Sequence, residues 1–390
     1  MTDRPRVIVV GAGVIGAAIA YHLGLEGCEV HCLGRTSAPQ PPTASWASAG
    51  GLKFQRVQSD LALLTLKSSR RWPRLPEELR TDLGLRLWGS LDLAITEADV
   101  PRLQTQMESD RAHGIQVEML SGGDFAEVGA PVGPLVPAGT FVANGGQADP
   151  RSTTRAFLQA GSRRGVSTTA VEVIDLILET GRVRGVITDT GRMEADLVVV
   201  AAGHWSASLV RMAGIELPLR PAGAHMLQSR PVTARLYPTI SAVGRLLSVK
   251  QLTSREILIG GGWPATVQAD GLTCLTRPES VERNLVNAAT VVPWTERLQM
   301  ERSWCGIDGE TPDHLPLIGP LAGMPSLYLA TGFSLGGFQL APGVGEMVAA
   351  EVARALPQPA LARVRPGRFD ELVDSQIRGF QQSQRDTPPR

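Results

Sequence analysis

The 390-residue sequence has no excess of charge of either sign and no long uninterrupted apolar run. Lys and Arg together number 38, as do Asp and Glu, so the formal net charge is zero. A balanced chain offers no broad basic surface, which argues against nucleic acid or anionic lipid as a partner. The most apolar stretch is interrupted by glycines, His22 and Glu26. It therefore predicts no transmembrane segment.

Cysteine is also scarce, with only Cys28, Cys32, Cys274 and Cys305. The first two residues form one short spacing with no second pair, so the sequence predicts no metal site. The N-terminus "MTDRPRVIVV" lacks a charged region followed by a long apolar stretch and a cleavage site. We therefore expect a cytoplasmic protein with reduced thiols.

What the sequence does contain is an ordinary globular composition, with 43% hydrophobic and 19% charged residues. The length suggests one large or two medium domains. At the N-terminus, the β-branched run "RVIVV" (6–10) is typical of a buried parallel strand. A glycine-rich turn, a helical segment ending near Gly27 and a second short strand "EVHCL" (29–33) follow it. This order predicts a βαβ unit.

Further α/β segments lie in the middle and at the end of the chain. The runs "ADLVVVAAG" (195–203) and "LYLATGF" (327–333) predict buried strands, and residues 149–165 and 341–356 predict helices. We expect an α/β (α+β) fold with a Rossmann-like domain built on a mainly parallel sheet from residues 1–79, 150–215 and 306–370. Residues 80–149 and 216–305 would form a second, substrate-binding domain with a mixed or antiparallel sheet and helices. Residues 371–390 would form a flexible polar tail.

The glycine-rich turn "GAGVIG" places Gly11, Gly13 and Gly16 at the spacing of a dinucleotide-binding motif. The first glycine allows the tight turn, the second lets the backbone approach a pyrophosphate, and the third lets helix and strand pack closely. The helix N-terminus offers unpaired N–H groups to the phosphates. Because the motif follows a strand and opens a helix, it predicts dinucleotide binding.

An acidic residue is missing where the second strand ends. In such chains an acid at this place accepts hydrogen bonds from the adenosine ribose, but "VHCLGRTSAPQ" (30–40) has Gly34 followed by Arg35. An arginine here favours NADP, because it could meet a 2′-phosphate. The motif alone leaves both FAD and NADP open. If the ligand is FAD, we expect the ribose to be held by backbone atoms or water beside these two residues, and Gly34→Glu to tighten binding.

Six segments in order carry a resemblance that favours the flavin. Besides "VIVVGAGVIGAAIAYHL" they are "TASWASAGGL" (43–52), "DPRSTTRAFLQAGSRRGV" (149–166), "DLVVVAAGHWS" (196–206), "TPDHLPLIGP" (311–320) and "LYLATGFSLGGFQLAPGVGE" (327–346). Together they resemble the D-amino-acid-oxidase-like family of FAD-dependent amine oxidoreductases, over nearly the whole chain. An aromatic monooxygenase would show a "GDAAH"-like block where "ATGFSLGG" stands.

The resemblance implies which residues hold FAD. The glycine-rich turn would bind the pyrophosphate, Gly34, Arg35 and Val171 would lie near the adenosine, and a helix opening near Pro342 would aim its N-terminus at the flavin. The implied cofactor-binding residues are Gly11, Gly13, Val14, Ile15, Gly16, Gly34, Arg35, Ser45, Ala49, Gly50, Gly51, Val171, Ala201, Ala202, Gly203, Trp205, Cys305, Gly332, Ser334, Leu335, Gly336, Gly337, Phe338 and Gln339.

Cys305 enters this set because monomeric sarcosine oxidase carries a covalent flavin thioether on a cysteine at a similar place. A small buried thiol with non-covalent FAD is the alternative that we favour. His204, His225 and His314 are pocket candidates by position only, since a lone histidine is more often structural.

The carboxylate anchors of the family are altered here. Leu335 stands where glycine oxidase has an arginine, and Gln339 stands where sarcosine oxidases have a lysine. Lys53 and Arg56 in "SAGGLKFQR" (48–56) match two arginine positions of sarcosine oxidase. The candidate catalytic residues are Lys53, Arg56, Gln339 and Arg302.

The resemblance therefore implies an FAD-dependent enzyme that oxidises the C–N bond of a small amine or amino acid by hydride transfer to flavin N5. Its substrate would be a D-amino acid, an N-substituted amino acid or an opine-like compound. A family lysine implicated in oxygen activation would align near Leu258, which has no charge, so a dehydrogenase passing electrons to a partner or quinone is slightly favoured over transfer to O2. The alternatives left open are a flavoprotein subunit of a hetero-oligomeric dehydrogenase, a homo-oligomer and, less favoured, an NADP-dependent dehydrogenase.

Overall fold

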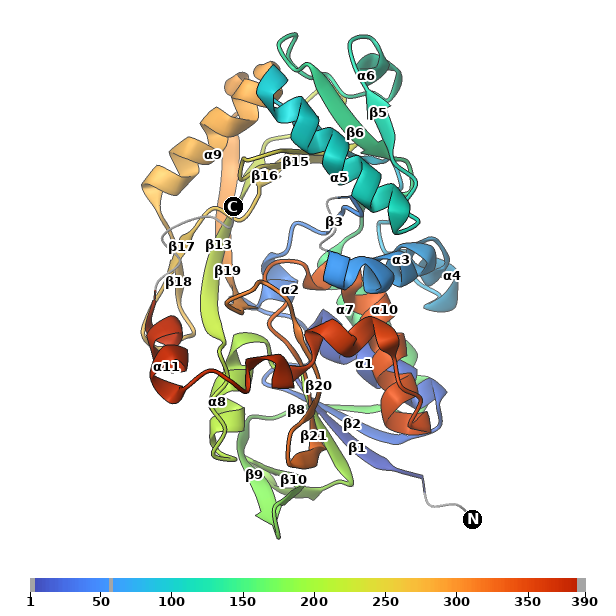
Figure 1. Ribbon diagram of the computed structural model, residues 1–390, viewed down its shortest axis with the longest axis vertical. Helices are drawn as coiled ribbons and strands as arrows, with labels where there is room; N and C mark the ends of the chain where they lie inside the picture. The colour runs from blue at the N-terminus through green and yellow to red at the C-terminus, as the bar shows by residue number, and fades with distance from the viewer. Residues whose placement is uncertain (1–3, 56–58, 384–390) are drawn as a thin grey trace.

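A computed structural model describes residues 4–55 and 59–383 of the chain. Two large sheets dominate it, one in the lower half of Figure 1 and the other in the upper half, with the long strands β13 and β19 running between them. No helix among the described residues is long and apolar enough to cross a membrane.

The lower sheet has six strands in the order β20-β21-β12-β1-β2-β8, and all of them except β20 run parallel. Its central strand is apolar on both faces, with Val7, Ile8 and Val9 at most 1% exposed, because helices and smaller strands cover it. The predicted Rossmann-like fold with a mainly parallel sheet is confirmed. The strands are β1 (Arg6–Val10), β2 (Glu29–Gly34), β8 (Ser167–Ala170), β12 (Leu197–Val200), β20 (Leu317–Leu321) and β21 (Met324–Thr331).

Helix α1 (Val14–Leu25) packs against α7 (Pro150–Ser162) and α10 (Gly337–Arg354) beside this sheet. Glycine allows the close approach of α10: a Cβ at Gly345 would lie 2.7 Å from the carbonyl oxygen of Ala18. The helix that the sequence predicted to open near Pro342 begins at Gly337, so this proline lies inside it.

The upper sheet has eight strands in the order β19-β13-β16-β15-β14-β4-β6-β5, mainly antiparallel with one parallel pair, β14 and β4. Helices α5 (Val100–Ala112) and α9 (Pro278–Val291) pack on it. This is the predicted mixed sheet with helices. The strands are β4 (Ser90–Ala94), β5 (Glu118–Leu120), β6 (Ala138–Val142), β13 (Arg220–Ser229), β14 (Thr239–Ala242), β15 (Ser248–Gln251), β16 (Ile257–Gly260) and β19 (Met300–Glu310).

Three small sheets and several short helices complete the fold. The antiparallel sheet β9 (Val173–Glu179), β10 (Arg182–Thr188) and β11 (Gly191–Glu194) lies at the bottom of Figure 1. The remaining elements are β3 (Gly51–Leu52), β7 (Gly146–Gln147), β17 (Ala265–Val267), β18 (Cys274–Thr276), α2 (Ala44–Ala47), α3 (Ala62–Arg71), α4 (Leu75–Glu78), α6 (Asp124–Glu127), α8 (Ser206–Arg211) and α11 (Asp374–Gln382).

Every strand of the six-stranded sheet comes from residues 1–79, 150–215 or 306–370, and on this basis we propose the two-domain division given above. Within the expected flexible tail, the described residues 371–383 include an ordered helix. Helix α11 packs against β13, where Arg220 lies over the Phe380 ring at 4.7 Å and Ile377 is buried. The polar composition of residues 371–390 gives no indication of these contacts, because they involve only a few side chains.

Candidate functional site

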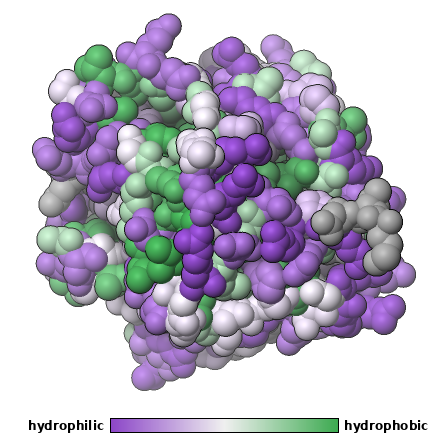
Figure 2. Space-filling model, turned by 90° about the horizontal axis from the view of Figure 1, so that it is seen from below, coloured by the Kyte–Doolittle hydropathy of each residue, from purple (hydrophilic) through white to green (hydrophobic). Residues whose placement is uncertain are grey.

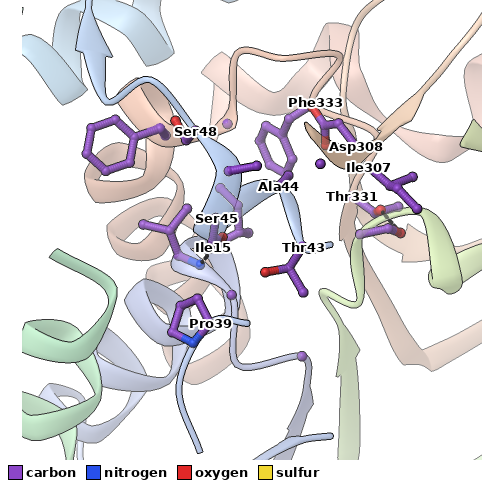
Figure 3. Close-up of a pocket in the computed structure, with 18 of the residues that line it drawn as sticks. Ile15, Pro39, Thr43, Ala44, Ser45, Ser48, Ile307, Asp308, Thr331 and Phe333 are labelled. Atoms are coloured by element: carbon purple, nitrogen blue, oxygen red, sulfur yellow. Dashed lines mark hydrogen bonds between the residues drawn. The ribbon is translucent and has the colours of Figure 1, made fainter. Parts of the chain in front are cut away.

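A cavity of about 810 Å³ lies where the two large sheets meet. It is lined by the β1–α1 turn, the ends of β2, β12 and β21, the loop around α2, and parts of β13, β14 and β19. Figure 3 shows Thr43, Ser45, Asp308 and Thr331 among the side chains around it. We call the part beside Arg35 and Glu172 the β2 end, and the part beside Lys53 and Ser241 the β14 end.

The glycine-rich turn forms one wall of the cavity. Gly11 has a φ of +119°, and a Cβ there would lie 2.3 Å from the Ala201 carbonyl oxygen, so only glycine fits this turn. The N-cap residue of α1 is Gly13, which has no side chain, and the Val14 N–H donates to Ser45 Oγ at 2.9 Å. The turn is thus a cradle of backbone donors that suits a pyrophosphate, and the residues present fit FAD.

At the β2 end, Arg35 is held by an acidic residue that the sequence reasoning missed. Its Nη2 lies 2.9 Å from Glu172 Oε1, and its Nε donates to the same oxygen at 3.1 Å. Its guanidinium lies 5.1 Å from the centroid of the Trp205 ring. A 2′-phosphate approaching Arg35 would meet this carboxylate, so the pair disfavours the NADP interpretation.

The β2 end also reaches the surface of the molecule. Seen from below, hydrophobic side chains gather on one part of the face among hydrophilic ones (Figure 2). Ile174 and Met212 line the cavity and are 49% and 44% exposed. A ligand end bound here would therefore be partly solvated.

The loop before α10 forms another part of the cavity wall. Two successive residues have left-handed backbones, Ser334 with φ +48° and Leu335 with φ +72°. The Leu335 N–H donates to Asp308 Oδ2 at 2.5 Å, and the Ser334 N–H donates to the Gly309 carbonyl at 3.0 Å. Strand β19 therefore holds this unusual loop in place, with the N-terminus of α10 directed at the cavity.

The β14 end contains a buried polar group built around Lys53. Its Nζ donates to Ser241 Oγ at 2.9 Å and lies 3.7 Å from Asp92 Oδ1, and Ser241 in turn donates to the same carboxylate at 2.8 Å. The Asp92 side chain is fully buried, whereas 24% of the Lys53 side chain is exposed. The predicted anchor Lys53 thus lines the cavity, with a carboxylate behind it.

The other candidate catalytic residues have different places. Gln339 lines the cavity, but its Oε1 accepts a hydrogen bond from the Lys53 backbone N–H at 3.1 Å, so it ties α10 to the chain after β3. Arg302 is exposed on β19 and does not line the cavity, so the structure contradicts its predicted place in the pocket. Arg56 lies outside the described residues.

Of the three candidate histidines, His204, His225 and His314, only His225 lines the cavity. It is fully buried on β13, and Asn284 Nδ2 lies 3.2 Å from its Nε2. Burial lowers the pKa of His225 to about 4, so it is neutral at pH 7. His204 instead bonds the Gly271 carbonyl at 3.0 Å, and His314 lies 3.3 Å from Glu310, so both are structural.

Cys305 does not line the cavity either. Its thiol lies beside that of Cys274 on β18, which donates to the Gly306 carbonyl at 3.7 Å. The next three residues of β19, Gly306, Ile307 and Asp308, do line the cavity, so Cys305 lies just beyond its edge. The geometry supports non-covalent FAD.

Most of the predicted cofactor residues line the cavity, and the exceptions have packing roles. A Cβ at Gly16 would lie 1.8 Å from the Gly11 carbonyl oxygen, and one at Gly50 would lie 2.1 Å from the Ala148 carbonyl oxygen. The predicted residues outside the lining are Gly16, Gly50, Cys305 and Ser334. Lining residues that the sequence reasoning missed include Thr43, Ser48, Glu172, Met226, Ile307, Asp308 and Thr331.

Known proteins match the chain along most of its length. A family model described as FAD dependent oxidoreductase (DAO) matches residues 6–351. Glycine oxidase from Geobacillus kaustophilus is 30% identical over 369 residues, covering 91% of this chain and 94% of that protein. Sarcosine oxidase subunit beta from Arthrobacter sp is 27% identical, covering 89% of this chain and 86% of that protein.

Solved structures show the same architecture. The crystal structure of glycine oxidase from Geobacillus kaustophilus superposes with a TM-score of 0.80 at 27% identity, covering 93% of this chain and 99% of that one. L-proline dehydrogenase from P. horikoshii shares the fold, with a TM-score of 0.83 at 23% identity over 95% of this chain and 99% of that one. The chain therefore belongs to the DAO family of FAD-dependent oxidoreductases and is an FAD-dependent enzyme.

Proposed function

We propose that this enzyme oxidises the C–N bond of a small amine that carries a carboxylate, with an N-substituted amino acid as the first candidate. Bound FAD supplies the two-electron oxidising chemistry, and the protein must position the substrate in a dry pocket. The relatives named above, a glycine oxidase and a sarcosine oxidase subunit, support this substrate class. The observation that carries the proposal is Lys53, a cation held by Asp92 and Ser241 in the cavity wall.

The position of Lys53 explains how the enzyme manages without the arginine of glycine oxidase. Leu335, which stands at that arginine position, lines the cavity but offers only an apolar side chain. Lys53 presents three donor hydrogens on a flexible stem. Its hydrogen bond to Ser241 can be shared with a substrate carboxylate, while Asp92 keeps the ammonium in place. We infer that the carboxylate lies at the β14 end and that apolar substrate groups face Leu335.

A substrate panel tests this proposal. Purified holoenzyme is mixed anaerobically with glycine, sarcosine, other N-methyl amino acids, D-amino acids and opines, and the flavin absorbance near about 450 nm is followed. We expect N-substituted amino acids to bleach the flavin fastest and the matching amines without a carboxylate to bleach it far more slowly. Equal rates with and without the carboxylate would contradict the role of Lys53.

A buried lysine favours molecular oxygen as electron acceptor, although the sequence favoured a dehydrogenase. Lys250 on β15 is 3% exposed, and burial lowers its pKa to about 7. Its register partner on β16 is Leu258, the residue near which the family lysine was expected. Ser248, on the same face of β15, lines the cavity. Lys250 itself is not among the lining residues, and we propose that it acts on O2 from behind the cavity wall, in place of a lysine at Leu258.

Reoxidation kinetics distinguish the two acceptors. Photoreduced holoenzyme is mixed with oxygenated buffer or with a quinone, and the return of the flavin absorbance is measured. An oxidase would reoxidise at least about tenfold more slowly with O2 in Lys250→Met than in wild type, because the cationic form is lost. Slow wild-type reoxidation with O2 and rapid reoxidation by the quinone would support a dehydrogenase.

A further inference from the structure

We propose that Glu172 supplies the carboxylate that binds the adenosine ribose of FAD, in place of the acid missing at Gly34. In folds of this kind, the acid that binds the ribose stands at the end of the second strand. This sequence has no acidic residue there. Glu172 instead follows β8, about 140 residues later in the chain. The inference concerns the cofactor and does not depend on which amine the enzyme oxidises.

Close packing explains why residue 34 carries no acid. A Cβ built on Gly34 would lie 2.7 Å from Ala12 Cβ and 3.1 Å from the Thr36 carbonyl oxygen. Any side chain there would have to displace the glycine-rich turn or its neighbour. Gly34→Glu is therefore not the simple restoration that the sequence suggested.

Strand pairing brings Glu172 to the required place. Strand β8 runs parallel to β2 with Ala170 opposite Gly34, and the Val171 N–H donates to the Gly34 carbonyl at 2.9 Å. Glu172 is the next residue, and it lines the cavity together with Arg35. Both strands end at the same edge of the sheet, where ligands of such folds bind.

The carboxylate is oriented before any ligand binds. Arg35 donates to Glu172 Oε1 through Nε, and Trp205 supports the guanidinium. The Glu172 backbone is also fixed, because its N–H donates to Asp189 Oδ1 at 3.1 Å and its carbonyl accepts from the Asp189 N–H at 3.0 Å. Preorganisation of this kind reduces the entropy lost on binding.

In the part of the chain that the structure describes, Glu172 is the carboxylate that lines this end of the cavity. Among residues 4–55 and 59–383, the acidic residues lining the cavity are Glu172 and Asp308. Asp308 accepts the Leu335 N–H in the loop before α10. Oε2 of Glu172 is not the oxygen that Arg35 contacts, and a carboxylate has lone pairs enough to accept both ribose hydroxyls and the arginine.

FAD affinity of the apoprotein tests the inference without any turnover. The titration follows the quenching of flavin fluorescence for wild type, Glu172→Gln and a matched control, Glu179→Gln. Glu179 lies on the adjoining strand β9, pairs with Arg192 at 2.8 Å and does not line the cavity. Its variant also replaces a half-exposed, arginine-paired glutamate by glutamine.

We expect Glu172→Gln to weaken FAD binding about tenfold, the usual effect of losing a charge-assisted hydrogen bond, and Glu179→Gln to leave it unchanged. An FAD analogue without the adenosine 2′- and 3′-hydroxyls completes a double-mutant cycle. It should bind wild type about tenfold more weakly than FAD does, but lose little further affinity with Glu172→Gln.

Equal FAD affinities for the two variants would overturn the proposal. So would an analogue that loses the same factor against wild type and Glu172→Gln, because the hydroxyls would then be read elsewhere. The Tm of each apoprotein shows whether a change in affinity reflects unfolding. Glu172→Asp, which keeps the charge but shortens the reach, serves as a second variant and should fall between wild type and Glu172→Gln.

Discussion

Among residues 4–55 and 59–383, an ion pair lies at each end of the cavity, and these two pairs differ in their exposure to water. At the β2 end the side chains of Arg35 and Glu172 are 45% and 50% exposed, whereas at the β14 end those of Lys53 and Asp92 are 24% and 0% exposed. Water and salt screen the first pair, while removing one partner of the second leaves a charge in a poorly solvated site. The comparison teaches that the β2 pair can be changed with little effect on folding, and the β14 pair cannot.

The largest expected effect is a loss of stability at acidic pH, to which the cavity contributes through the buried His225. Burial lowers the pKa of His22, His204 and His225 to about 4. The unfolded chain has histidine pKa values near about 6.5, so between these values it binds more protons than the folded one, and stability falls as pH falls. We expect a loss of about 2 kcal/mol per histidine between pH 7 and pH 5.

Urea unfolding of the holoenzyme at the two pH values measures this loss. His225→Gln should reduce the pH dependence by about one third, since one of three proton sites is removed. A free energy of unfolding that stays constant between pH 7 and pH 5 would show that the three histidines are not held neutral.

The next effect is that of Lys53→Met, which we expect to destabilise the protein by about 2 kcal/mol because Asp92 stays buried. The matched control is Lys67→Met. Lys67 lies 2.6 Å from Glu346, but both side chains are 34% exposed, so its loss should change the free energy of unfolding by less than about 1 kcal/mol. Chemical denaturation measures both. Equal losses in the two variants would remove the distinction between buried and exposed pairs.

Arg35→Gln is expected to have a smaller effect on folding, within about 1 kcal/mol, because its partner Glu172 remains half solvated. FAD binding should weaken by a smaller factor than in Glu172→Gln, since the ribose carboxylate is still present but less well oriented. Thermal unfolding of the apoprotein measures the change in stability, and fluorescence titration measures the change in FAD affinity. A loss of stability as large as that of Lys53→Met would contradict the proposed difference between the two ends.

The smallest effect is expected for Cys305→Ala, which lies outside both ends of the cavity. Because its thiol faces Cys274, flavin content should not change. Acid precipitation of the wild-type holoenzyme should release all flavin into the supernatant. A yellow precipitate from wild type and a colourless one from Cys305→Ala would instead demonstrate a thioether link.

Local sequence patterns predicted the glycine-rich turns and loops of this site. They did not predict the side chains that pairing between distant strands brings to it. Gly11 and Gly332 were predictable because tight turns demand left-handed or close-packed backbones, with φ of +119° and +73°. The places of Glu172 at the cavity and of Lys250 opposite Leu258 were not predictable, since they depend on the registers of β8 on β2 and of β15 on β16. Gln339 was predicted to face the cavity, yet its bond to the Lys53 backbone depends on a contact 286 residues apart in sequence.

Strand β19 has a mechanical consequence. It belongs to the eight-stranded sheet, yet the Ile307 N–H donates to the Pro42 carbonyl at 2.7 Å, just before α2. The following residues, Asp308 and Gly309, hold the loop before α10. Strand β19 therefore connects the loop before α2 and the loop before α10 to the eight-stranded sheet. A hinge rotation between the sheets would have to break these bonds, so adaptation to substrates of different size must come from side chains and loops elsewhere on the cavity rim.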